Sequence, residues 1–322
     1  MYQKLNFNFF KFLSKIRIED LLCVMFVIGI FYYGGTQVIS KGLTIGESDL
    51  WDFSLYLFPF SLVIFLLSLR YAIYGGASFQ NSVYSIVIET IRDWLPFFLF
   101  LFFYEIFATS FWSAISKPDL DSKLLAWDRF LFGETPSVWM DRWVQPWLTD
   151  ILAVAYFLHV VLPLIISYAC YRKNKPLFRY FLLAFLLGGI LGNIGYIFVP
   201  GVGPNIAYPQ LYAHGLNGAF YGSVAGILDI VRAPRDIFPS LHVCLSTIVL
   251  WCGAKLGRKW LWFLLPLVLG NWISTIYLRY HYMVDVIVGF ALAFLVLFLA
   301  KWLLLFEKRF RTWIERVGMT RT

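Results

Sequence analysis

Residues 283–305 read MVDVIVGFALAFLVLFLAKWLLL, an apolar run long enough to cross a membrane as one helix. A helix rises about 1.5 Å per residue, so roughly 20 apolar residues span the hydrocarbon core of a bilayer. Seven similar runs occur in this chain of 322 residues, 60% of which are hydrophobic. The eight predicted spans are 20–40, 54–74, 94–115, 148–171, 177–199, 240–256, 260–278 and 283–305. They predict an all-α, polytopic membrane bundle.

The predicted spans divide the basic residues unequally between the two sides of the membrane. If the N-terminus is cytoplasmic, the inside segments hold 19 of the 27 Lys and Arg residues and the outside segments hold 8. Lys and Arg resist translocation, so this bias predicts that both termini are cytoplasmic. The net charge of +8 therefore needs no nucleic-acid partner, and the basic C-terminal tail suits anionic lipid headgroups.

The polar groups that need an explanation are concentrated in one part of the chain. Residues 1–91 are expected to form an interfacial helix and two accessory spans with few polar side chains. Residues 92–306 are expected to form a six-helix catalytic core, and residues 307–322 a basic cytoplasmic tail. Gly188 and Gly192 have the spacing of small residues that lets two membrane helices approach closely.

Two of the predicted outside segments are long. Segment 116–147 combines charged residues with four tryptophans, which predicts a helix in the membrane interface. These tryptophans are Trp127, Trp139, Trp143 and Trp147. Segment 200–239 opens with PGVGPNIAYP and predicts a loop, because glycine, proline and asparagine favour turns.

Ionisable residues within a membrane are costly and therefore mark candidate functional sites. His242 begins one predicted span and His281 precedes another, 39 residues later. That distance allows one crossing and one return, so both histidines are expected at the same outer face. His281 and Asp285 are four residues apart, and the carboxylate is expected to accept a hydrogen bond from the imidazole.

The sequence Pro239-Ser240-Leu241-His242 is typical of a helix start. The first N–H groups of a helix have no partner within it and attract anions. Arg279, together with Arg232 and Arg235 in the loop, adds positive charge. Two imidazoles, a carboxylate and arginines at a helix N-terminus predict phosphate chemistry, in which one histidine attacks phosphorus and the other protonates the leaving oxygen.

Other interpretations remain open for these residues. His159 and His214 are expected to be satisfied polar groups rather than catalysts. His242, His281 and Asp285 could instead bind zinc or iron, although neighbouring arginines oppose a cation. A serine hydrolase based on Ser240 lacks the Gly-x-Ser-x-Gly elbow.

The chain resembles the type-2 phosphatidic acid phosphatase superfamily of membrane lipid phosphatases and phosphotransferases. PSLH at 239–242 resembles the family motif Pro-Ser-Gly-His, and STIYLRYHYMVD at 274–285 resembles Ser-Arg-x5-His-x3-Asp. Thr275 replaces the motif arginine, and Arg279 follows four residues later, where helical spacing would place it on the same face.

The chain also departs from the family pattern in ways that indicate a branch. No Arg-Pro dipeptide is present, so the first motif, Lys-x6-Arg-Pro, is missing, and Arg232 and Arg235 are the candidates for its phosphate-binding role. FPSLH, YLRYHYMVDVIVG, WDRFLFGETP and VPGVGP are similar to the branch that contains fungal inositol phosphorylceramide synthase. The resemblance covers roughly residues 92–305.

The resemblance implies a role for each matched residue. His281 would be the nucleophile that forms a phosphohistidine, and Asp285 would orient it. His242 would protonate the leaving alcohol and then deprotonate the incoming one. Ser240, Arg279 and the helix N–H groups would hold the phosphoryl group, and the family implies no metal or other cofactor.

We therefore expect a multi-pass enzyme of a bacterial cytoplasmic membrane, with its active site facing outward. Its substrate would be a lipid phosphate or lipid phosphodiester. With water as acceptor it would be a phosphatase, and with an alcohol or ceramide-like acceptor a headgroup transferase. A non-enzymatic lipid or anion transporter is the alternative of another class. The sequence determines neither the lipid, the acceptor nor the oligomeric state.

Overall fold

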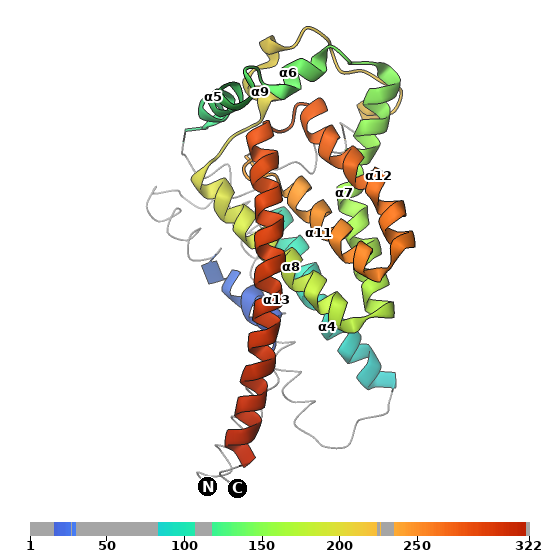
Figure 1. Ribbon diagram of the computed structural model, residues 1–322, viewed down its shortest axis with the longest axis vertical. Coiled ribbons are helices and arrows are strands. Elements are labelled where there is room, and N and C mark those ends of the chain that lie inside the picture. Colours follow the sequence, from blue (N-terminus) through green and yellow to red (C-terminus); the bar gives the residue numbers. More distant parts are fainter. Residues whose placement is uncertain are drawn as a thin grey trace, which may run out of the picture. The chain divides into compact units, whose positions relative to one another are not determined.

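The computed structural model describes residues 16–26, 28–29, 83–106, 118–223, 226 and 235–319 (Figure 1). These residues contain helices, turns and loops and no β-strand. They fall into two compact units, residues 20–103 and residues 1–19 with 104–322. The predicted all-helical membrane bundle is confirmed, whereas the count of eight spans and the domain limits at residues 92 and 307 stay predictions.

The smaller unit contains helical residues within 20–29 and most of α4 (Val83–Ile106). Within this unit, Cys23 Sγ lies 3.7 Å from the carbonyl oxygen of Pro96, and the rings of Phe26 and Phe100 are 5.8 Å apart. The predicted spans 20–40 and 54–74 lie largely or wholly outside the described residues. α4 starts before the predicted span 94–115, the end of which is also outside them.

The described part of the larger unit contains five long helices, four of which are long and apolar enough to cross a membrane. Their bounds are α7 Pro146–Lys173, α8 Lys175–Phe198, α11 Leu241–Leu256, α12 Arg258–Tyr277 and α13 Met283–Met319. α11 is apolar but shorter than the other four. Prolines near the starts of α7 and α8 suit those positions, because they need no hydrogen-bond donor there. All five helices match predicted spans closely, except that α13 continues beyond residue 305.

Helix α11 packs against α7, α8, α12 and α13. The predicted close approach at Gly188 and Gly192 occurs here, because a side chain at either position would press on Cys244 or Leu241 of α11. On the other side, a Cβ at Gly289 of α13 would lie 2.5 Å from the carbonyl oxygen of Ser240. Small residues on both neighbours therefore hold the start of α11 in place.

An outer layer of short elements covers one end of this bundle (Figure 1). It consists of α5 Asp121–Phe132, α6 Pro136–Asp141, α9 Pro204–Ala207 and the 3-10 turn η2 Pro209–Leu211. The single interfacial helix predicted in 116–147 is two helices, separated at Gly133, whose φ of 79° suits glycine. The four predicted interfacial tryptophans are exposed. Segment 200–239 is largely loop where it is described, as predicted.

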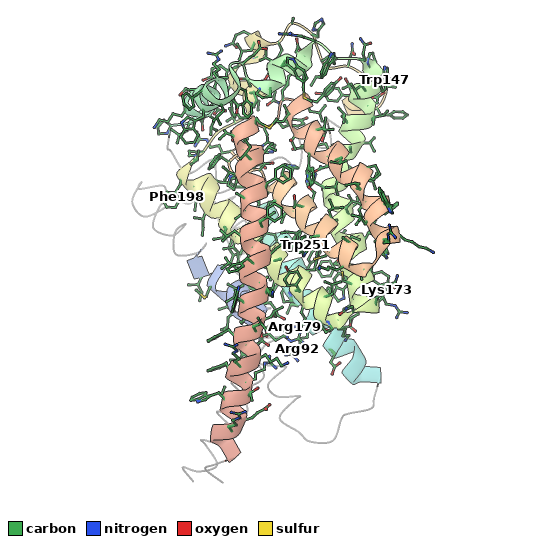
Figure 2. All side chains as sticks on the ribbon, in the orientation of Figure 1. Arg92, Trp147, Lys173, Arg179, Phe198 and Trp251 are labelled. Carbon is green, nitrogen blue, oxygen red and sulfur yellow. The ribbon has the colours of Figure 1, made fainter. Side chains whose placement is uncertain are left out.

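The two ends of the bundle differ in their side chains. Figure 2 shows Trp147 at the end with the outer layer, and Lys173 and Arg179 at the opposite end. The ends of α11 and α12 meet at this opposite end, and they add three more basic residues there: Lys255, Arg258 and Lys259. This distribution is the one that the positive-inside rule describes.

Candidate active site

Two histidines from different helices meet beneath the outer layer. His242 lies in the first turn of α11, and His281 lies in the turn between α12 and α13. Nε2 of His281 is 3.2 Å from Nδ1 of His242, within hydrogen-bonding distance. His281 is buried and His242 is partly exposed. One crossing and one return of the chain thus bring the two imidazoles together.

The hydrogen bonds of His281 define which nitrogen carries its proton. Nδ1 lies 3.0 Å from the carbonyl oxygen of Ile237, which can only accept, so Nδ1 is the donor. In the neutral ring Nε2 then has the lone pair, and it faces His242. Asp285 Oδ2 is 3.5 Å from the same Nδ1, so a carboxylate also supports the protonated side of the ring.

Asp285 is fully buried at the start of α13. Its Oδ2 accepts the N–H of Tyr282 at 2.9 Å, which fixes the side chain beside His281. Among the described residues, no hydrogen-bond donor contacts its Oδ1. A buried carboxylate with an unused oxygen is costly, and such groups are found at functional sites more often than elsewhere.

Ser240 connects the two histidine-bearing segments. It is the N-cap of α11, and its hydroxyl accepts the N–H of Val243 at 3.5 Å. Its own N–H donates to the carbonyl oxygen of Asp285 at 3.1 Å. The start of α11 is therefore attached to the first turn of α13, which sets the separation of the two imidazoles. The phosphate-binding role implied for Ser240 stays a prediction.

Arg279 does not lie where helical spacing would place it. α12 ends at Tyr277, and Arg279 has a φ of 64°, so residues 275 and 279 do not share a helix face. Its guanidinium donates to Asp141 Oδ1 and to the carbonyl oxygen of His214, each at 2.6 Å. It also lies 4.1 Å from the ring centre of Tyr212. In this structure Arg279 joins the outer layer to the bundle, and none of these partners belongs to the histidine pair.

Arg235 and Arg232 of the loop were both predicted to bind phosphate, and the structure describes only the first of them. Arg235 forms an ion pair with Asp119, with Nε 2.9 Å from Oδ1, in the part of the outer layer before α5. Arg232 lies outside the described residues. Their predicted roles in binding phosphate stay predictions.

Helix α7 contributes two residues that the sequence did not assign to the site. Tyr156 stacks on His242 with ring centres 4.4 Å apart, and the ring of His159 is 4.1 Å from His242. His159 Nδ1 also donates to the carbonyl oxygen of Tyr156 at 2.6 Å. The hydrogen bond agrees with the expected satisfied histidine, but the ring belongs to the site. The only sequence signal was a polar pair, three residues apart, within an apolar span.

Four aspartates of the outer layer and α7 bind backbone N–H groups, and their role was not recognised from the sequence. Asp121 accepts from Val202 and Gly203, each at 3.0 Å, and Asp150 accepts from three consecutive residues of the loop at 219–221. Asp141 accepts from Ala213 and His214, and its Oδ2 is 3.1 Å from His214 Nδ1. His214 is thus a satisfied polar group, as expected. These bonds attach the 200–221 loop above the histidines.

The fourth aspartate, Asp128, holds the start of α13. It is fully buried, and its two oxygens accept the N–H groups of Met283 and Val284 at 3.0 and 2.9 Å. Burial raises the pKa of Asp128, while these two hydrogen bonds lower it. The preceding Tyr282 donates its hydroxyl to Asp121 at 3.0 Å, and burial, with the nearby Asp121 charge, raises its pKa. The outer layer therefore fixes the residues on both sides of His281.

The comparison with protein families covers this whole region. A family model described as the PAP2 superfamily matches residues 122–299, more than half of the chain. The chain belongs to the PAP2 superfamily. The matched range runs from α5 into α13 and includes both histidines and Asp285.

A curated relative points in the same direction. The chain is 27% identical over 195 residues to the phosphoinositol dihydroceramide synthase of Bacteroides thetaiotaomicron. The match covers 54% of this chain and 63% of that protein, so the chain spans less than two thirds of its relative. No solved structure matches the chain. Family membership and the synthase relative together support a phosphoryl-transfer enzyme, and the apolar helices support an integral membrane protein.

Proposed function

We propose that this protein transfers the phosphorus-bearing group of a lipid phosphate or lipid phosphodiester, through a covalent intermediate on His281. The observation that carries this proposal is the pair His281 Nε2 and His242 Nδ1, with the opposite nitrogen of His281 protonated and supported by a carboxylate. A nucleophile, a second imidazole and an orienting carboxylate are the parts that covalent catalysis with acid–base assistance requires.

The first step forms a nitrogen–phosphorus bond and breaks a phosphorus–oxygen bond. The lone pair of His281 Nε2 attacks phosphorus, and the leaving oxygen takes a proton from His242. The positive charge that develops on His281 is stabilised through Nδ1–H by the carbonyl oxygen of Ile237 and by Asp285. Because the two nitrogens are in hydrogen-bond contact, the phosphorus group must separate the imidazoles when it enters.

The second step reverses the first with a new alcohol or water. His242, now neutral, takes the proton of the acceptor as its oxygen attacks phosphorus, and the bond to His281 Nε2 breaks. Protons and charge are restored at the end of the cycle, so His281 and His242 are ready for another substrate. The mechanism uses only side chains that the structure places within contact of one another.

The relative favours an alcohol acceptor over water. Its name describes the synthesis of phosphoinositol dihydroceramide, in which a phospho-headgroup is joined to a ceramide-type lipid. We therefore infer that this chain is a headgroup transferase, with hydrolysis as the competing reaction. The acceptor would approach through the partly exposed side of His242.

We further infer that the site faces the outside of a bacterial cytoplasmic membrane. The support is the positive-inside rule, because the turns at the other end of the bundle are rich in Lys and Arg. The relative is also bacterial. A cysteine introduced at the exposed position Trp139 should be labelled in intact cells by a thiol reagent that does not cross membranes. The four native cysteines are buried, so the label reports on the introduced one. Protection of that cysteine until the cells are opened would place the site on the inside.

The test of the reaction is incubation of the purified protein in lipid nanodiscs with a panel of lipid phosphates and phosphodiesters. Each reaction is run with and without inositol, a second polyol or a ceramide, and the products are identified by mass spectrometry. A headgroup attached to one of these alcohols supports the transferase, and free phosphate alone in every case makes the protein a phosphatase. Lipid binding without any turnover would favour the transporter.

A chelator arm addresses the metal interpretation. Among the described residues, no cluster of three His, Cys, Asp or Glu side chains is placed to hold a metal ion. The histidine mechanism predicts that EDTA leaves the rate unchanged. Inhibition that zinc reverses would instead support a metal bound by His242, His281 and Asp285.

A further inference from the structure

The imidazole of His242 is surrounded by three other rings. His281 lies on one side as its hydrogen-bond partner, with ring centres 5.3 Å apart. The other two rings come from α7: Tyr156 is stacked at 4.4 Å with an interplanar angle of 27°, and His159 is tilted at 4.1 Å and 65°. The stacked Tyr156 is closer to His242 than the 6 Å within which the face of a tyrosine attracts a cation, and His159 makes an edge contact with the same ring.

The two α7 rings are themselves held in place. His159 Nδ1 and the side-chain nitrogen of Asn271 both donate to the carbonyl oxygen of Tyr156, at 2.6 and 3.3 Å. Asn271 belongs to α12 and is fully buried, so this carbonyl joins α7 to α12. The ring of Tyr156 also contacts Tyr280, with centres 4.8 Å apart. The positions of the Tyr156 and His159 rings are therefore fixed by the bundle before substrate binds.

The titratable groups near His242 come from several elements. α7 supplies Tyr156 and His159, and the turn before α13 supplies Tyr280 and His281. Asp285 of α13 contacts His281 rather than His242. The buried tyrosines Tyr196 and Tyr277 lie near the ends of α8 and α12, at the end of the bundle that holds the histidines. The nearest carboxylate thus contacts His281, whereas the rings of α7 contact His242.

We propose that Tyr156 and His159 form an aromatic seat for His242, in which His159 acts as a positioning residue. The seat holds the His242 ring towards His281 and stabilises its protonated form, which the proposed reaction requires when the leaving oxygen takes a proton. This inference rests on the proposed function, because only the proposed reaction requires a protonated His242. The ring of His159 packs against His242 and keeps it stacked on the face of Tyr156, which attracts an imidazolium through its π-electrons.

The test measures the titration of His242 directly, without turnover. The chain has only four histidines, so protein made with ¹⁵N-labelled histidine gives few imidazole signals. The His242 signal is assigned by its loss in His242→Gln. His159→Leu removes the ring, His159→Phe keeps an uncharged ring, and His214→Leu is the matched control in the outer layer.

We expect His159→Leu to lower the midpoint of the His242 titration by about one pH unit, because the seat stabilises the charged ring. His159→Phe should restore most of this shift, and His214→Leu should cause none. If His159→Leu does not fold, His159→Gln replaces it and is expected to lower the midpoint similarly. An unchanged midpoint in a folded variant without the ring would overturn the proposal.

Kinetics supply a second readout once a substrate is known. The alkaline limb of the kcat profile should move to lower pH in His159→Leu by the same amount as the titration, with the KM for the lipid changed less than about twofold. A raised KM with an unmoved midpoint would make His159 a substrate-binding residue and contradict the seat. A moved midpoint in a protein without turnover would keep the seat and reject the proposed function.

Discussion

The two ends of the helical bundle both bury charged groups, but they treat them differently. At the end opposite the outer layer, Arg179 binds Glu19 at 2.7 Å and Glu307 at 2.9 Å, and Arg311 binds Glu307 at 2.7 Å. Glu19 and Glu307 are both buried. Arg17 also lies 4.0 Å from Glu19, so each carboxylate has two guanidinium partners in this cluster, which we call the ionic cluster.

The buried carboxylate of the histidine site is less well compensated than those of the ionic cluster. Asp285 is as buried as Glu19, yet its neighbour is an imidazole 3.5 Å away rather than a guanidinium, and one of its oxygens has no donor among the described residues. We infer from this comparison that the ionic cluster stabilises the fold, whereas the histidine site keeps a lone pair and a carboxylate available for the proposed reaction. Substitutions at the two ends should therefore separate stability from activity.

The largest effect is expected for His281→Ala, which removes the proposed nucleophile. Activity should fall by at least about 10,000-fold, because no other group can form the intermediate. His214→Ala serves as the control, since His214 is a partly exposed histidine of the outer layer. Initial rates of lipid turnover measure the effect, and thermal unfolding in detergent confirms that both variants are folded. Comparable activity in the two variants would contradict the assigned nucleophile.

Arg179→Met should have a large effect on stability and little on catalysis. It removes the closest partner of the buried Glu19 and one of the two arginines that bind Glu307, and breaking a buried ion pair typically costs about 3–5 kcal/mol. The double change Arg179→Met with Glu19→Gln should recover part of the loss, because it removes the charge of Glu19 that lost its closest partner, while Glu307 keeps Arg311. Unfolding curves measure the free energy, and kcat per folded molecule should stay within about twofold. A variant that is as stable as the wild type but has lost activity would contradict the assignment of the ionic cluster to stability.

Asp285→Asn should have the opposite signature. It keeps the shape of the side chain and an oxygen that can accept the Tyr282 N–H, but removes the charge beside His281. Activity should fall by about 100-fold or more, because the positive charge that develops on His281 loses its support. Stability should be unchanged or slightly higher, since a buried charge is removed. A large loss of stability with normal kcat would show that Asp285 is structural.

Asp128→Asn should have the smallest effect, and one that depends on pH. Burial raises the pKa of Asp128, so the folded state binds its proton more tightly than the unfolded state. The stability of the wild type relative to the variant should therefore fall as the pH rises through the ordinary aspartate pKa of about 4, and level off above the folded-state pKa. Unfolding measured from pH 4 to pH 8 tests this; a difference that grows with pH in favour of the wild type would contradict it.

The features that follow from local chain properties were predicted correctly. Apolar length located the five long helices of the larger unit, and glycine spacing predicted that another helix approaches closely at Gly188 and Gly192, where the structure places α11. The separation of His242 and His281 by one crossing and one return predicted that they lie at the same end of the bundle, where the structure brings them into contact. Each of these inferences needs only helix geometry and bilayer thickness.

The features that depend on packing between distant segments were missed or misplaced. Asp128 looks like one charge of a surface helix, but it is buried because α5 lies over the start of α13. Arg279 was expected on a helix face, yet α12 ends two residues earlier and the guanidinium turns to Asp141. His159 reached the site only because α7 packs against α11. No local pattern carries this information.

The central claim is the covalent intermediate on His281, and trapping it is the most direct test. The enzyme is mixed with a lipid substrate labelled at phosphorus, quenched within milliseconds to seconds at alkaline pH, digested and analysed by mass spectrometry. The mechanism predicts a labelled phosphorus group on the peptide that contains His281, which is lost in acid and absent from His281→Ala. Turnover with no label on this peptide, or with the label on Ser240, would contradict it.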